Sequence, residues 1–134
     1  MVTETRRGRL LLAGVAWAGV GVALLLPGDL LQQATSWLGW QSRPSPPCSG
    51  LMCLDKLVHL AIFGVLCWLT ARIRPRSRRA QLLSLLAVAT YGWLLEGLQG
   101  WLGWRETDLL DALCNTVGAL LGLLFAVSRP WRRD

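Results

Sequence analysis

Charged side chains are scarce in this sequence: Asp, Glu, Lys and Arg make up 16% of the 134 residues, whereas hydrophobic residues make up 53%. A soluble domain carries about 25% charged residues, so this chain has too little polar surface to cover a water-exposed fold. Histidine occurs only once, and one histidine with scattered cysteines does not make a zinc site. The composition therefore argues against a soluble enzyme, and we expect neither a metal nor a cofactor.

The apolar residues are gathered into four runs that are separated by polar segments. The runs are residues 10–26, 57–73, 82–98 and 109–127, and the segments between them are 27–56, 74–81 and 99–108. A membrane-spanning helix needs roughly 17 to 25 mostly apolar residues, and each run reaches the lower limit. The sequence therefore predicts an all-α membrane protein in which residues 1–134 form one domain, a bundle of four transmembrane helices in the lipid bilayer.

Basic residues mark the orientation of this bundle. Eleven of the fourteen lie before the first run, at the end of the second run and in the segment that follows it, or after the fourth run. Basic residues in short loops stay on the cytoplasmic side. We therefore expect both termini in the cytoplasm. No small-x-small cleavage site follows Leu26, so we interpret the first run as an uncleaved helix rather than a signal peptide. The basic residues are not interleaved with aromatic ones, and we expect no nucleic-acid binding.

The first outer loop, residues 27–56, contains two further features. The segment from Asp29 to Trp40 has a capping residue and places its apolar side chains on one face, which predicts a short helix lying in the membrane interface. Cys48 and Cys53 would face an oxidising compartment, where they could be joined by a disulfide or remain free.

Polar side chains recur where three of the predicted helices reach the outer surface. They share helix faces through spacings of three or four residues, as in Asp55 with His59 and Asp111 with Asn115. Charges in membrane helices usually face the bundle interior, which predicts an outward-facing polar pocket. Its candidate residues are Asp55, His59, Glu96, Gln99, Arg105, Asp108, Asp111 and Asn115. Gly118 and Gly122 continue the same stripe more deeply and predict a helix-packing face.

Taken together, these residues resemble the VanZ-like family of small bacterial membrane proteins, in order and approximate spacing, over residues 55–124. The resemblance rests on Asp55, Lys56, His59, Phe63, Tyr91, Glu96, Gln99, Arg105, Asp111, Asn115, Gly118 and Gly122. One departure is Gly103-Trp104, where the family commonly has a Pro-Gly turn. The family is named for resistance to teicoplanin, a lipoglycopeptide that acts outside the cytoplasmic membrane. The resemblance thus implies a multi-pass protein of the bacterial cytoplasmic (inner) membrane with a cell-envelope role, including antibiotic resistance.

Three functions are compatible with an outer polar pocket, and the sequence leaves the oligomeric state open. The first is binding of a lipid headgroup, a lipid-linked glycan or a lipoglycopeptide, with Arg105 contacting an anionic group. The second is an intramembrane enzyme with Glu96 or Asp111 as general base and His59 as proton shuttle. The third is a small proton-coupled transporter. The same groups could also form a purely structural ion network. We favour binding, because mixed donors and acceptors converge at headgroup depth without a complete catalytic signature.

Overall fold

The chain folds into long helices, as the sequence predicts. The computed structural model describes residues 6–26, 30, 33, 36–37, 54–73, 77–103 and 108–128. Within these ranges the long helices are α1 (Arg6–Leu25), α3 (Leu54–Ile73), α4 (Arg78–Leu102) and α5 (Leu109–Ser128). The predicted interfacial helix after Asp29, the cysteines at 48 and 53, and Arg105 fall outside the described residues, apart from isolated positions between 30 and 37.

Three of the helices, α3, α4 and α5, are long and apolar enough to cross a membrane, which confirms a multi-pass membrane protein. The apolar part of α1 is shorter and covers Leu10–Leu25. At 1.5 Å per residue it extends about 24 Å, less than the roughly 30 Å of a bilayer's hydrocarbon core. The four-helix prediction is therefore confirmed for the helices themselves, whereas the apolar part of the first one is shorter than those of the other three.

Helix α4 extends beyond the predicted run 82–98 at both ends, because its capping residues lie outside the apolar stretch. At its start, the side chain of Ser77 accepts a hydrogen bond from the backbone N–H of Ala80 at 3.2 Å, as an N-cap residue does. At its end, Gly103 adopts the left-handed conformation (φ 67°) and its N–H donates to Gly100, a glycine C-cap.

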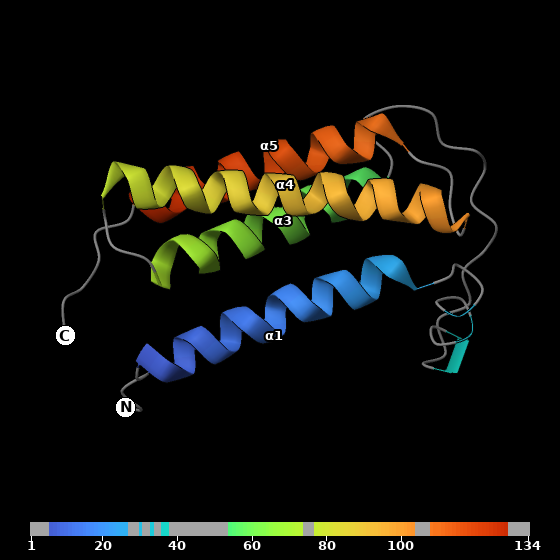
Figure 1. Ribbon diagram of the computed structural model, residues 1–134, viewed down its shortest axis with the longest axis horizontal. Helices are drawn as coiled ribbons and strands as arrows, with labels where there is room; N and C mark the ends of the chain where they lie inside the picture. The colour runs from blue at the N-terminus through green and yellow to red at the C-terminus, as the bar shows by residue number, and fades with distance from the viewer. Residues whose placement is uncertain are drawn as a thin grey trace.

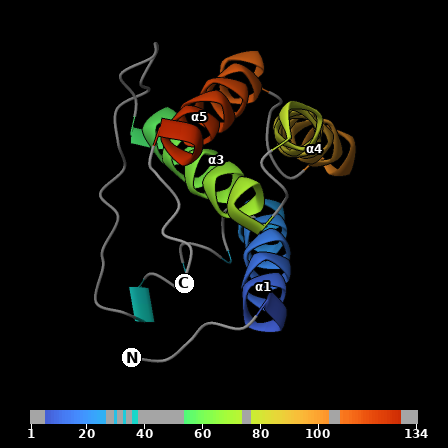
Figure 2. The same cartoon turned by 90° about the vertical axis from the view of Figure 1, so that its left-hand side faces the viewer.

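Helix α3 is central to the arrangement, since it contacts each of the other three helices. Figures 1 and 2 show α5 packed along α3, with α4 on one side of this pair and α1 beyond α3. Helices α3 and α5 begin at the same end of the bundle at which α4 ends, the right-hand end in Figure 1. Residues close to the starts of α3 and α5 and to the end of α4 therefore lie at the same end of the bundle (Figure 1).

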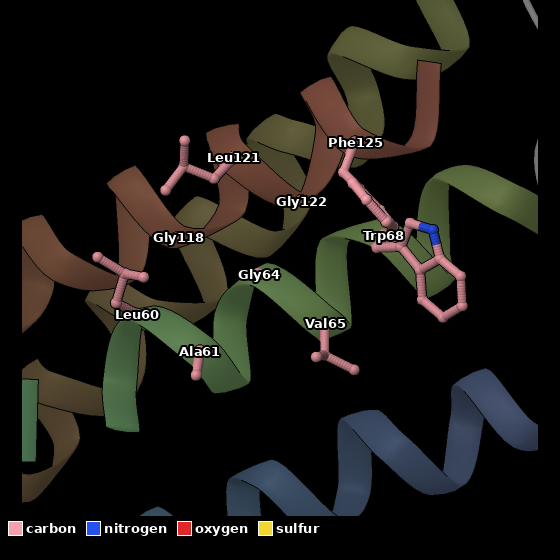
Figure 3. A pocket seen from close by; sticks show the side chains of 9 residues that line it. All are labelled: Leu60, Ala61, Gly64, Val65, Trp68, Gly118, Leu121, Gly122 and Phe125. Carbon is pink, nitrogen blue, oxygen red and sulfur yellow. The ribbon is translucent and has the colours of Figure 1, made fainter. Parts of the chain in front are cut away.

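The backbones of α3 and α5 approach very closely through glycines. A Cβ atom built at Gly118 or at Gly122 would collide with the backbone carbonyl of Leu60 or of Gly64, respectively. Figure 3 shows Gly64, Gly118 and Gly122 along the line where the two helices meet. Lipid offers no hydrophobic driving force for helix association, so close packing of small residues is a main source of stability.

Helix α1 is attached to α3 and α4 by polar contacts as well as by packing. The indole Nε1 of Trp17 donates to Thr70 Oγ1 at 3.0 Å, and the Tyr91 hydroxyl donates to the backbone carbonyl of Trp17 at 2.8 Å. The rings of Trp17 and Tyr91 also pack at a centroid distance of 4.7 Å. These part-buried hydrogen bonds hold α1, whose apolar part is shorter than those of the other helices, against α3 and α4.

Candidate functional site

Polar side chains from α3, α4 and α5 meet at the end of the bundle where α3 and α5 begin. We call this group the polar cluster; it consists of Asp55, Lys56, His59, Glu96, Asp108, Asp111 and Asn115. Most members are buried, whereas Asp55 is exposed and the side chain of Asp108 is 42% exposed. These two aspartates form the rim through which a ligand could reach the cluster.

Lys56 holds two of the carboxylates together. Its Nζ lies 2.5 Å from Asp108 Oδ2 and 2.8 Å from Asp111 Oδ1, and the whole residue is only 5% exposed. A buried ammonium is tolerated only when it is paired and hydrogen-bonded. Lys56 thus neutralises part of the negative charge of the site by pairing with Asp108 and Asp111.

Sequence reasoning missed Lys56 as a site residue, because it was assigned to the outer loop just before the span 57–73. The structure begins α3 at Leu54, which brings Lys56 into the first turn of the helix. A signal was present in the sequence: Asp108 and Asp111 are three residues apart and share one helix face. Two such carboxylates entering a membrane require a counter-ion at the same depth.

Asp108 also starts α5. Its Oδ1 accepts a hydrogen bond from the backbone N–H of Leu110 at 2.8 Å, the geometry of an N-cap. The hydrogen bond from Lys56, followed by the one from Leu110, holds the pKa of Asp108 below its usual range. The Asp108 carboxylate is consequently charged at neutral pH, and this electrostatic stabilisation is lost only as the pH falls through that lowered value.

His59, Glu96 and Asn115 form the buried inner part of the cluster. Asn115 Oδ1 lies 2.9 Å from His59 Nδ1, and Glu96 Oε1 lies 3.7 Å from the same nitrogen. The side chain of Asn115 is fully buried, and its Nδ2 has no hydrogen-bond partner among the residues described. Gly92 of α4 makes room for this group, because a Cβ there would come within 2.9 Å of Asn115 and Phe63.

Most of the predicted pocket residues are brought together in this way. Gln99 is placed elsewhere, since its Nε2 donates to the backbone carbonyl of Leu24 in α1. It therefore ties α1 to α4 instead of lining the pocket. Arg105 lies outside the described residues. Two carboxylates of the cluster, those of Asp108 and Asp111, are held by Lys56.

Acidic groups outnumber basic ones in the polar cluster. It holds four carboxylates against one lysine. One ligand atom each from Asp55, His59 and Asp111 lies within 4.8 Å of the others, so these three residues could hold a cation.

An apolar groove of about 420 Å³ follows the line where α3 and α5 meet. It begins at Leu60, next to His59, and at Gly118, one helical turn beyond Asn115, and it ends at Trp68 and Phe125 (Figure 3). Its complete lining is Leu60, Ala61, Gly64, Val65, Trp68, Gly118, Leu121, Gly122 and Phe125. The polar cluster and the apolar groove thus both involve α3 and α5.

Comparison with known proteins supports the resemblance seen in the sequence. The model of the VanZ/LLP1 family matches residues 11–129, which include most of α1 and extend well beyond the region 55–124. No curated protein and no solved structure matches the chain. Since the match covers most of the sequence, the chain belongs to the VanZ/LLP1 family.

Proposed function

We propose that the polar cluster binds the polar headgroup of a cell-envelope lipid or lipid-linked glycan at the outer face of the bacterial cytoplasmic membrane. The observation that carries this proposal is that the polar cluster and the apolar groove are built on the same two helices, α3 and α5. An amphiphilic ligand has the same division into a polar end and an apolar chain. The groove is the place for one acyl or prenyl chain of such a ligand, and its entirely apolar lining supports this occupant.

The charge of the cluster supports a headgroup rich in hydroxyl or amine groups. Carboxylates accept hydrogen bonds and do not donate them, and four of them lie here beside one lysine. The rim residues Asp55 and Asp108 are exposed enough to meet such groups. Arg105 precedes Asp108 by three residues and is the candidate contact for any anionic group on the same headgroup.

The same side chains also suggest a second candidate function, an enzyme that acts on the bound lipid. Its support is the contact of His59 Nδ1 with Glu96 at 3.7 Å and Asn115 at 2.9 Å, which orients the imidazole as a general base requires. His59 and Glu96 are 1% and 6% exposed, and this burial keeps both groups away from a substrate at the rim. We therefore favour binding over catalysis.

This proposal requires both termini in the cytoplasm, so that the cluster faces outward. The uneven distribution of Arg residues supports that orientation. We expect green fluorescent protein fused at the C-terminus to fluoresce, and alkaline phosphatase fused after Gly103 to be active in intact bacteria. A C-terminal phosphatase fusion should be inactive. The opposite pattern at both positions would place the cluster at the cytoplasmic surface and contradict the proposal.

Ligand binding is tested by native mass spectrometry of the protein released gently from its own membrane. Wild type should retain a lipid or glycolipid, and Ala61→Trp, which fills the groove from an exposed position, should reduce the retained fraction at least about fivefold, or roughly 1 kcal/mol. Glu96→Gln should also reduce it, because it changes the charge of the buried carboxylate with little change in shape.

The matched control is Leu83→Trp, which adds the same indole at an exposed position of α4 outside the groove. This variant should retain lipid like wild type. Equal retention in all four proteins would rule out a specific site in the groove and cluster. Displacement of the retained lipid by added teicoplanin would connect the site with glycopeptide resistance.

A further inference from the structure

We propose that Asp55, His59 and Asp111 form a binding site for a divalent transition-metal ion of the Zn²⁺ or Mn²⁺ type. The composition argued against a metal, since the chain has one histidine. The structure brings that histidine between two carboxylates, and one ligand atom from each of the three residues lies within 4.8 Å of the others. Asp55 and His59 are one helical turn apart on α3, whereas Asp111 comes from the first turn of α5.

Asn115 provides an independent indication that His59 is prepared as a ligand. Its fully buried Oδ1 lies 2.9 Å from His59 Nδ1, and in the tautomer in which Nδ1 donates this hydrogen bond the lone pair is on Nε2. Metal-bound histidines almost always donate their second ring nitrogen to such an oxygen. The Nδ2 atom of Asn115 has no partner among the described residues, so the carboxamide is held in place without a full set of hydrogen bonds of its own.

The ligand chemistry and the charge fit such an ion. One imidazole nitrogen suits Zn²⁺ and related metals, and carboxylate oxygens suit Mn²⁺ and Zn²⁺. With metal–ligand bonds of about 2.0–2.2 Å, ligand atoms of one ion lie about 3–3.6 Å apart, so these side chains need to close by roughly an ångström. A 2+ ion would also offset the excess of carboxylates in the polar cluster.

Lys56 does not block this site. It contacts Asp111 through Oδ1 at 2.8 Å and Asp108 through Oδ2 at 2.5 Å, and a carboxylate has a second oxygen that can bind a metal. Three protein ligands leave at least one coordination position for water or another oxygen ligand. Asp55 is exposed and places that open position at the rim. Metal binding by these three residues does not require a bound lipid.

The test is direct metal binding by the full-length protein in detergent after removal of metals with a chelator. Calorimetric titration with Zn²⁺, and separately with Mn²⁺, should show one site per chain for at least one of the two ions. The same ion should raise the melting temperature of wild type. Asp55→Asn, at an exposed position, should weaken the affinity on the order of 10- to 100-fold and abolish the rise in melting temperature. His59→Gln, with its helix content checked by circular dichroism, should do the same.

The matched control is Asp108→Asn. Like Asp55→Asn, it removes one negative charge from the polar cluster, and it also removes a hydrogen-bond acceptor of Lys56. All three proposed metal ligands remain, so the metal affinity of this variant should stay within about threefold of wild type. Three results would overturn the site: no stoichiometric binding of either ion by wild type, equal affinity in Asp55→Asn, or an equal loss in Asp108→Asn. The last would indicate attraction by charge alone.

Discussion

Replacing Lys56 by methionine is expected to lower the free energy of unfolding by about 3–5 kcal/mol, because it leaves a buried carboxylate without its counter-ion. The side chain of Asp111 is 7% exposed and loses the ammonium that lies 2.8 Å from its Oδ1. Methionine is of similar length and supplies no charge. Asp108 is 42% exposed and can turn to water, so the cost arises mainly at Asp111. Reversible unfolding in mixed micelles measures this change.

A second variant separates the charge from the shape of the side chain. In Lys56→Met/Asp111→Asn both charges are absent, and the double variant should be clearly more stable than Lys56→Met alone. Arg79→Gln, at an exposed position, serves as the control for loss of a positive charge and should change stability by less than about 0.5 kcal/mol. A loss in Lys56→Met no larger than that of the control would mean that the pair is not structurally important.

Much of the polar cluster could be predicted from spacing, because helical periodicity decides which residues of one helix share a face. Asp55 with His59, and Asp111 with Asn115, were paired in this way, and the structure joins the two pairs through the hydrogen bond between His59 and Asn115. Spacing does not decide which helix a face meets. Gln99 lies three residues from Glu96, yet its side chain reaches Leu24 of α1.

The helix ends were harder to predict than the helices, for a physical reason. Apolar runs mark the hydrocarbon part of a helix, whereas caps and first turns are polar and lie at the interface. Ser77 and Gly103 limit α4 several residues outside its apolar run, and the first turn of α3 includes Lys56. A site at the membrane surface is built from such terminal turns. Hydropathy alone therefore assigns Lys56, which pairs with two carboxylates of the site, to a loop.

Replacing Gly122 by alanine is expected to destabilise the bundle by about 2–3 kcal/mol, the upper range for overpacking a close contact. A Cβ at this position would overlap the backbone carbonyl of Gly64. Neither partner is a flexible side chain, so α3 and α5 must move apart along the most extensive helix pair of the described structure. In lipid this separation weakens the packing that holds the two helices together. Unfolding in mixed micelles measures the loss.

Gly97→Ala is the matched control, since the same methyl group is added to another helical glycine with nothing within 4 Å of its Cβ position. Alanine favours the helix over glycine by up to about 1 kcal/mol, so this variant should be neutral or slightly more stable than wild type. The separation of α3 and α5 should also disturb the polar cluster, because Asp55 and Asp111 are on these two helices. Gly122→Ala should therefore lose ligand retention together with stability, whereas a variant that lost neither would show that the glycine contact is not required for the α3–α5 pair.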